Sequence, residues 1–383
     1  MTKIRIHSRL SELDRDQWQA LRHSRYPFLD YDFLLTLESS GSIGQETGWL
    51  PYYIVAYNDT ESDPIEWIVP AFIKTHSYGE YVFDWSWAEA YQHHGLAYYP
   101  KLLCAVPFTP STGPRLLHGP NTSAEQLWPN ITALLDQLCE QQSLSGWHIN
   151  FLPATHALAI TDEQHQPAMR HGCQFHWHNR GYTDFDHYLD TFTSRKRKSV
   201  RKERQKITQQ GIQIHRKTGT EISTDDIEFF YQCYQMTYAQ RRSRGYLNVD
   251  FFRQLLRDMS SQMLLVLAHD NDTPVAAALY FFDEHCLYGR YWGSLVDADA
   301  LHFEACYYQG IEFCIERKLT RFDPGTQGEH KISRGFEPIT TYSLHRLQHS
   351  DFHHAVHDFV HQEQQHIAQY QQQARSLLPF KID

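Results

Sequence analysis

The densest group of reactive side chains in the sequence lies in one glycine-rich segment near the C-terminal end. Within six positions, Glu329, His330, Lys331 and Arg334 supply a carboxylate, an imidazole, an ammonium and a guanidinium group. A carboxylate or imidazole can transfer protons, and the two cations can hold an anion. We expect Glu329 or His330 to be a catalytic base, and Lys331 and Arg334 to bind phosphate. A Glu329–Arg334 ion pair that only pins the loop is the alternative.

A strongly basic segment over residues 194–206 (SRKRKSVRKERQK) holds eight Lys or Arg residues and one Glu, although the whole chain has a net charge of −10. Apolar positions and a following glycine predict a helix over 191–210 with one buried face. Like charges repel one another along a helix, and a bound polyanion would relieve that repulsion. The residues expected to bind phosphate groups are Arg197, Lys198, Arg201 and Lys202. A solvated surface without a ligand is the alternative.

A Pro- and Gly-rich segment before a predicted helix at 123–142 offers another anion site. Free backbone N–H groups and the positive end of a helix dipole attract phosphate. We therefore expect Thr112, Gly113 and Arg115 to contact the phosphates of a cofactor. An ordinary Pro-rich turn is the alternative.

Acidic and aromatic residues are concentrated around residues 76–87. His76, Glu80 and Asp84 are four residues apart, a spacing that would place them on one helix face as an acid–base or metal-binding set. The sequence around them (YGEYVF) is more typical of a strand or turn, where the carboxylates would cap loops. The residues expected to line a cleft are His76, Glu80, Asp84, Trp85, Trp292 and Glu304, and Tyr291 is a candidate catalytic acid.

Several classes of protein are excluded by what the sequence lacks. The seven cysteines are never spaced as Cys-x-x-Cys, so we expect neither a disulfide framework nor a zinc site, and we expect no metal. The sequence has no Gly-x-Ser-x-Gly, P-loop or His-Glu-x-x-His motif, which argues against hydrolases, ATPases and metalloproteases. Its longest apolar run, residues 275–282, is far shorter than the ~20 residues that cross a bilayer. Without a signal peptide either, the protein is expected to be cytoplasmic.

Hydrophobic periodicity predicts the elements that position these groups. The predicted helices are 13–22, 30–39, 127–142, 191–210, 224–242, 249–260, 303–318 and 352–377. The predicted strands are 52–57, 65–74, 147–152, 212–216, 263–269, 274–282, 287–292, 321–323 and 340–347. Each half has helices, an antiparallel hairpin or meander, a longer helix and a closing strand, which predicts an α+β fold with a mixed, mainly antiparallel sheet in each half. We expect domains over 1–180 and 181–350, the second including the basic helix, and a C-terminal amphipathic helix over 351–383.

Six blocks of the sequence resemble the bacterial FemAB-like predicted N-acyltransferases. They are 76–87 (HSYGEYVFDWSW), 98–103 (YYPKLL), 106–116 (VPFTPSTGPRL), 288–293 (YGRYWG), 301–308 (LHFEACYY) and 325–336 (GTQGEHKISRGF). The resemblance implies two tandem units of the acyl-CoA N-acyltransferase (GNAT) type that face a shared cleft.

The same resemblance implies a function. We expect an N-acyltransferase that moves an acyl or aminoacyl group from acyl-CoA or aminoacyl-tRNA onto an amine of a small molecule or peptide, with tRNA as a partner. The alternative is a non-catalytic recognition module that binds a peptidoglycan precursor or nucleic acid in the cleft.

Overall fold

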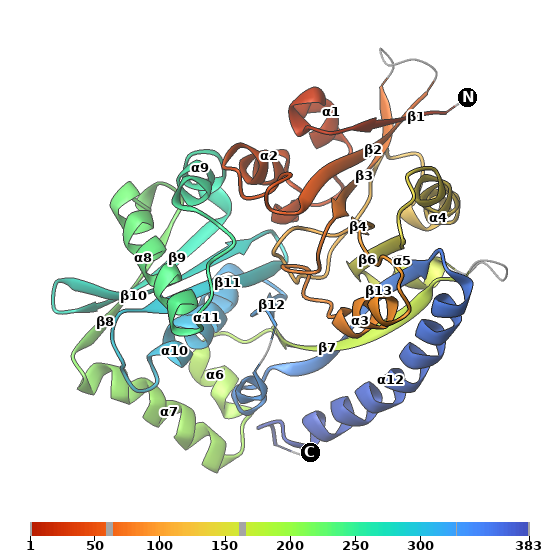
Figure 1. The fold of residues 1–383 in the computed structure, drawn as a ribbon. Helices are drawn as coiled ribbons and strands as arrows, with labels where there is room; N and C mark the ends of the chain where they lie inside the picture. The colour runs from red at the N-terminus through yellow and green to blue at the C-terminus, as the bar shows by residue number, and fades with distance from the viewer. Residues whose placement is uncertain (1, 59–63, 161–165, 327, 382–383) are drawn as a thin grey trace. The chain divides into compact units, whose positions relative to one another are not determined.

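The computed structural model describes residues 2–58, 64–160, 166–326 and 328–381 (Figure 1). The chain forms two compact units. Unit 1 comprises Met1–Gly172 and Thr340–Gln369, and unit 2 comprises Cys173–Ile339 and Tyr370–Asp383. The chain therefore returns to unit 1 after building unit 2, whereas the sequence predicted a boundary at 180 and a separate helix from 351.

Unit 1 is built on a mixed sheet. Its strands lie in the order β1 (Lys3–His7), β2 (Trp49–Tyr57), β3 (Ile65–Lys74), β4 (Lys101–Cys104), β6 (Gly146–Leu152) and β13 (Glu337–Leu347), with β5 (Leu117–His118) beside β3. Neighbouring strands are antiparallel except β4 and β6, which run parallel and are connected by helix α4 (Ala124–Gln141). The shorter helices are α1 (Arg15–Ala20), α2 (Tyr31–Ser39), α3 (Trp85–His93) and α5 (Ala154–Ala159).

Helix α4 provides the apolar core on one face of this sheet. Ser123 caps its first turn, in a capping box completed by Gln126. Trp128 and Leu135 of α4 are completely buried, and they belong to the same core as Trp147 of β6. The capping box therefore already uses the backbone N–H groups of Ser123 and Gln126, two of the donors at the expected anion site.

Unit 2 repeats this arrangement. Its strands lie in the order β8 (Ile212–Thr218), β9 (Met263–Asp270), β10 (Thr273–Phe282), β11 (Cys286–Ser294), β12 (Arg321–Asp323) and β7 (Ala168–His178). β11 and β12 run parallel, and the other neighbours are antiparallel. The chain between β11 and β12 forms α10 (Leu301–Phe303), the π-helical turn η5 (Glu304–Tyr308) and α11 (Gln309–Arg317).

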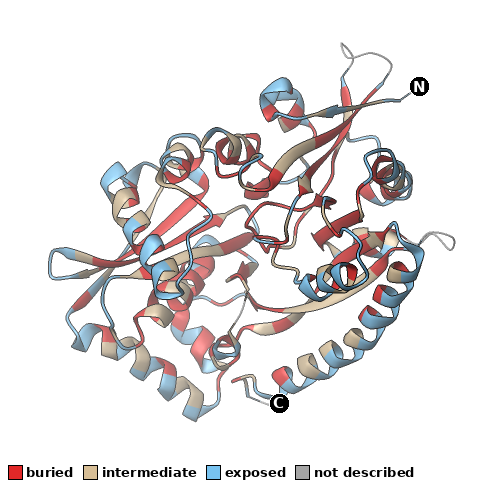
Figure 2. Cartoon of the chain, in the orientation of Figure 1, coloured by how far each residue is buried: buried red, intermediate tan, exposed pale blue. Residues whose placement is uncertain are grey.

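The other described helices of unit 2 include the basic helix and two helices that precede β9. They are α6 (Phe185–Asp190), α7 (Ser194–Gln209), α8 (Thr224–Gln240), α9 (Val249–Met259) and the 3₁₀ helices η3 (Gly219–Glu221), η4 (Ser260–Gln262) and η6 (Glu329–Arg334). Helix α12 (Ser350–Ser376) begins in unit 1 and ends in unit 2. The central strands are buried, whereas α7 and α12 have long exposed faces (Figure 2).

Both units thus have antiparallel strands followed by a parallel pair that a helix connects. The expectation of an α+β fold with a mixed, mainly antiparallel sheet in each half is confirmed. Several elements differ from the sequence prediction: α3, α5, β4, β5 and β7 were not predicted, and the predicted helix over 303–318 is interrupted by η5. Among the described residues, none of the helices is long and apolar enough to span a membrane.

The start of β6 has no room for a side chain. A Cβ atom on Gly146 would lie 2.1 Å from the carbonyl oxygen of Arg346 on β13. We expect Gly146→Ala to lower the free energy of unfolding by about 3 kcal/mol, because backbone atoms must move. Gly119→Ala is the matched control, since its nearest neighbouring atom would be 3.8 Å away, and should change stability by less than about 0.5 kcal/mol. Urea unfolding measures both, and equal midpoints would contradict this account.

Candidate functional site

Helix α7 uses much of its positive charge in ion pairs within unit 2. The pairs are Arg197–Asp190 (2.8 Å), Arg201–Asp186 (2.8 Å), Arg204 with Glu304 (2.9 Å) and Glu312 (2.6 Å), and Lys206–Asp299. Lys198 and Lys202 are exposed and have no acidic partner among the described residues. Of the four residues expected to bind phosphate, two are therefore already paired and two are open to solvent.

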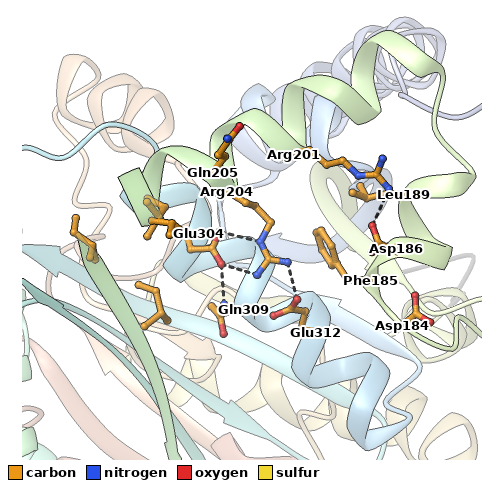
Figure 3. A pocket seen from close by; sticks show the side chains of 14 residues that line it. Asp184, Phe185, Asp186, Leu189, Arg201, Arg204, Gln205, Glu304, Gln309 and Glu312 are labelled. Carbon is orange, nitrogen blue, oxygen red and sulfur yellow. Dashed lines mark hydrogen bonds and ion pairs between the residues drawn. The ribbon is translucent and has the colours of Figure 1, made fainter. Parts of the chain in front are cut away.

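Arg204 lies in a cavity of about 750 Å³ between α6, α7, β8 and the η5–α11 segment (Figure 3). Its guanidinium group reaches Glu304 and Glu312 and lies 4.6 Å from the centre of the Phe185 ring. Glu304 is 3% exposed and also accepts a hydrogen bond from Gln309 (2.7 Å). The charged residues of this lining are Asp184, Asp186, Glu304, Glu312, Arg201 and Arg204. Because carboxylates outnumber guanidinium groups, this cavity does not favour an anion.

A second group of polar residues forms around η6. Arg334 is buried; it donates hydrogen bonds to the carbonyl oxygen of His330 (2.6 Å) and to both oxygens of Glu203 (2.9 and 2.8 Å). Its guanidinium carbon lies 3.4 Å from the centre of the Phe303 ring, and the Tyr308 hydroxyl also donates to Glu203. Arg334 therefore fixes η6 to α7 and α10 rather than offering its charge to a phosphate.

Lys331 is also turned inward. Its Nζ donates hydrogen bonds to the carbonyl oxygens of Gly325 (2.7 Å) and Thr326 (3.2 Å). Burial lowers the pKa of Lys331 to about 8. The ammonium group thus closes the glycine-rich turn before η6, and the structure does not present it as a phosphate ligand.

The two candidate bases lie in different surroundings. Glu329 is exposed, and its carboxylate accepts a hydrogen bond from Tyr370 of α12 (2.9 Å). His330 is joined by a 2.7 Å hydrogen bond between Nε2 and the Tyr307 hydroxyl of η5. Burial of the imidazole, with the charges of Lys331 and Arg334, lowers the pKa of His330 below its usual value. Both side chains are exposed, but His330 is held beside the Tyr307 hydroxyl at the end of unit 2's helical segment η5, whereas Glu329 contacts Tyr370 of α12.

A second cavity, of about 600 Å³, lies where α8 and β11 end. Trp292 and His302 line it, with their rings 5.6 Å apart, and His302 lies 5.8 Å from His330, measured between ring centres. Burial, followed by the charge of His330, lowers the pKa of His302 to about 4. The cavity and the His330–Tyr307 pair therefore share His302 as a neighbour.

The position of β11 beside α8 depends on a glycine. A Cβ atom on Gly293 would lie 1.8 Å from the carbonyl oxygen of Cys233, and Thr237 donates a hydrogen bond to the carbonyl oxygen of Trp292 (2.7 Å). Tyr291, the candidate acid, packs among Phe230, Tyr234 and Phe252. Burial raises the pKa of Tyr291, which makes it a weaker acid than a free phenol.

In unit 1, a buried ion cluster holds two residues of the sequence prediction, Glu80 and Asp84. Lys101 is completely buried and donates hydrogen bonds to Glu80 (2.8 Å), Asp84 and Ser77 (2.9 Å). Burial raises the pKa of Glu80 to about 7. Burial by itself raises the pKa of Asp84, but the charge of Lys101 outweighs this and holds that pKa below its usual value. Tyr98 completes the cluster with a hydrogen bond to Asp84 (2.6 Å).

His76 and Trp85 lie outside that cluster. His76 Nε2 is hydrogen-bonded to the carbonyl oxygen of Thr47 (2.9 Å), and burial lowers its pKa. Trp85 is 40% exposed and packs edge-on against Tyr78. The four-residue spacing therefore does not place His76, Glu80 and Asp84 on one helix face. Helix α3 begins only at Trp85.

The Pro- and Gly-rich segment is buried rather than open to a ligand. Arg115 is 1% exposed and donates hydrogen bonds to the carbonyl oxygens of Asn150 (2.8 Å), Ser111 (2.7 Å), Gly113 (3.1 Å) and Pro114 (2.8 Å). A Cβ atom on Gly113 would lie 2.4 Å from the Tyr26 ring. The expected phosphate contacts of Thr112, Gly113 and Arg115 are thus replaced by packing within unit 1.

A family model described as FemAB-like, peptidoglycan biosynthesis/recognition, matches residues 9–382. The chain belongs to the FemAB-like family. No curated protein sequence matches it. The crystal structure of FemX aligns with this FemAB-like chain at a TM-score of 0.50 and 11% identity, covering 93% of this chain and all of FemX.

A second solved structure shows the same fold. It is the C-terminal domain of a putative lysylphosphatidylglycerol synthetase from Agrobacterium fabrum, with a TM-score of 0.51 and 10% identity, covering 91% of this chain and 95% of that one. At such low identity these likenesses concern the fold alone. Within the described ranges of this FemAB-like chain, no group of three His, Cys, Asp or Glu residues is arranged to hold a metal ion.

Two residues of unit 2, Tyr307 beside His330 and Arg241 in the lining of the 600 Å³ cavity, were absent from the expected site. Tyr307 lies in the sequence block 301–308 that carries the family resemblance, but its contact with His330 depends on the π-helical turn. Arg241 lines the 600 Å³ cavity and follows α8 directly. The run of arginines at 241–244 is the sequence signal that could have indicated it.

The buried ion cluster of unit 1 should be sensitive to loss of its cation. Lys101→Met would leave Glu80 and Asp84 buried beside an apolar side chain, and we expect it to cost about 3–5 kcal/mol of unfolding free energy. Adding Glu80→Gln and Asp84→Asn should recover part of this loss. Lys198→Met removes an exposed lysine and serves as the control, with less than about 0.5 kcal/mol of change. Denaturant unfolding decides, and a loss in Lys101→Met no larger than in the control would contradict the assignment.

The histidine pair of unit 1 predicts a dependence of stability on pH. His148 Nδ1 lies 2.8 Å from His345 Nδ1, and burial, then the charge of Lys101, lowers the pKa of His148 to about 3. The unfolded chain protonates His148 near its usual pKa of about 6.5. Between these values the unfolded state holds more protons, so the free energy of unfolding falls as pH falls.

The slope of that fall can be tested directly. One imidazole changes the free energy of unfolding by at most about 1.4 kcal/mol per pH unit. As the pH falls from about 6 to 4, we therefore expect the free energy of unfolding to fall less steeply in His148→Gln than in the wild type, by about 1 kcal/mol per pH unit. Urea unfolding at three pH values measures both slopes. Equal slopes would show that His148 titrates alike in both states.

Proposed function

We propose that this FemAB-like protein is an N-acyltransferase that moves an acyl or aminoacyl group from an activated donor, acyl-CoA or aminoacyl-tRNA, onto an amine. The observation that carries this proposal is the hydrogen-bonded His330–Tyr307 pair in unit 2, beside a cavity whose lining includes His302. Membership of the FemAB-like family supports it. The acceptor is an amine of a small molecule or a peptide, and a peptidoglycan precursor is the peptide that the family description favours.

The pair can supply both proton transfers that the reaction needs. In one tautomer of His330, the Nε2–H group donates a hydrogen bond to the Tyr307 oxygen. The Nδ1 atom then has a lone pair that can accept a proton, and the phenolic hydrogen of Tyr307 remains free to be donated. The amine nitrogen attacks the carbonyl carbon of the donor while Nδ1 accepts the proton that the nitrogen loses. When the bond from carbon to the donor's sulfur or oxygen breaks, Tyr307 donates a proton to the leaving group. His330 returns a proton to Tyr307, so the products are an amide and a free thiol or hydroxyl group.

The electrostatic surroundings of His330 suit this role. A base must be neutral to accept a proton, and the lowered pKa keeps the imidazole neutral at pH 7. Arg334 holds the carbonyl oxygen of the same residue at 2.6 Å, which fixes the backbone that carries the ring. Among the described residues, the hydrogen-bond partner of the Glu329 carboxylate is the Tyr370 hydroxyl of α12. We therefore give the base role to His330.

Kinetics of His330 variants test the assignment. With acyl-CoA donors and a panel of amines, the rate of free-thiol release should fall about 10²- to 10⁴-fold in His330→Gln. In the wild type, kcat/KM should rise with pH through the lowered pKa of His330 and stay level above it, because only the neutral imidazole accepts a proton. The His330→Gln variant should lack this acidic limb.

Two further variants separate the alternatives. Tyr307→Phe should lower kcat while leaving KM nearly unchanged, because the hydroxyl acts on the leaving group. Glu329→Gln should retain most of the activity. A loss of turnover in Glu329→Gln alone would transfer the base role to that carboxylate. Salt-sensitive binding of a precursor or nucleic acid without any turnover would favour the recognition module instead.

A further inference from the structure

Unit 2 has a second concentration of positive charge, distinct from α7. Arg241, Arg242 and Arg244 follow one another where α8 ends, and all three are exposed. Within the described part of the chain, none of them has an acidic partner, whereas four cations of α7 do. Planar guanidinium groups that are free of carboxylates are well suited to bind phosphate. We call this group the α8 arginine cluster.

The α8 arginine cluster reaches the 600 Å³ cavity at Arg241. Arg241 itself lines that cavity, and its charge contributes to lowering the pKa of His302 after burial and nearer cations. Leu295 and Val296 line the cavity, and their side chains are 42% and 43% exposed. Met236 and Trp292 extend this apolar surface. Exposed apolar side chains gathered around one cavity indicate a binding surface for an apolar group.

We propose that this cavity is the donor site and binds an acyl thioester of the acyl-CoA class, with its phosphates on the α8 arginine cluster and its acyl chain against Leu295 and Val296. This inference rests on the proposed function, because it names the donor. It places the thioester carbonyl toward His302 and the His330–Tyr307 pair. The lining contains one acid, Asp297, which is exposed, so the cavity favours an acyl chain over the α-ammonium of an aminoacyl ester.

The ligand chosen for the test carries both recognised features. Isothermal titration calorimetry with octanoyl-CoA and with octanoyl-pantetheine, which lacks the nucleotide phosphates, separates the contribution of phosphate from that of the chain. In Arg241→Gln/Arg244→Gln we expect affinity for octanoyl-CoA to fall about tenfold or more, with a weaker dependence on salt. Affinity for octanoyl-pantetheine should stay unchanged. Leu295→Asp should weaken both ligands, because it places a carboxylate beside the chain.

A matched variant on α7 controls for general electrostatics. Arg195→Gln/Lys196→Gln removes two positive charges, as Arg241→Gln/Arg244→Gln does. Arg195 and Lys196 have no acidic partner among the residues that the structure describes, and they do not line the cavity. It should bind octanoyl-CoA as tightly as the wild type. An equal loss in this control, or no binding of octanoyl-CoA by the wild type, overturns the inference. Binding of charged tRNA alone also overturns it, in favour of the other donor.

Failure of the inference and failure of the proposed function give different results. If octanoyl-CoA binds as expected but no amine in the panel releases thiol, transfer is refuted and the binding site stands. If Arg241→Gln/Arg244→Gln releases thiol at the wild-type rate and KM, transfer stands and the donor site is refuted.

Discussion

The charge of a single buried guanidinium group organises the candidate site. Arg334 lies over the face of Phe303, binds both oxygens of Glu203 and holds the carbonyl oxygen of His330. Burying a cation is unfavourable unless it is paired and hydrogen-bonded, so these contacts must form together. They join α7, α10 and η6, and the 2.7 Å contact between His330 and Tyr307 lies beside them. Glu203, the one acid of the basic segment, therefore has a larger structural role than its neighbouring cations.

The two units use the same strand arrangement for different purposes. In unit 1, the space past the parallel pair β4–β6 is filled by the protein itself, with Arg115 bound to four carbonyl oxygens of its surroundings. In unit 2, the parallel pair β11–β12 covers three residues of each strand, as β4–β6 does in unit 1, and two cavities lie beside the elements that follow β11. Both larger cavities described here belong to unit 2. Unit 1 has a smaller cavity of about 230 Å³, lined in part by Arg22 and His156.

Local patterns in the sequence were enough to predict most elements but not the partners of charged residues. The strands Ile65–Lys74 and Arg321–Asp323 have the predicted bounds, because turn residues and alternating or apolar runs mark them. β7 was missed since its sequence, AMRHGCQFHWH, is polar and rich in histidine. The phosphate role expected of Arg115, Lys331 and Arg334 required knowing which carbonyl or carboxylate oxygens lie nearby. For Arg334 these are carboxylate oxygens of Glu203, which is distant in the sequence. For Lys331 the carbonyl oxygen of Gly325 is close in the sequence, but the turn must fold back to bring it to the ammonium group.

The return of the chain to unit 1 sets the order in which a ribosome can complete the two halves. The first unit contains β6, whose partner strand β13 and the histidine that faces His148 are supplied only after residue 340. At ~5–20 residues per second, the roughly 200 residues between Gly172 and Gln369 take about 10–40 s to synthesise. During that time β6 and the buried Lys101 cluster lack their last neighbours while nearly all of unit 2 emerges. Unit 1 is thus completed only after most of unit 2 has been synthesised, although it contains the N-terminus, and the last residues of the chain, Tyr370–Asp383, then complete unit 2.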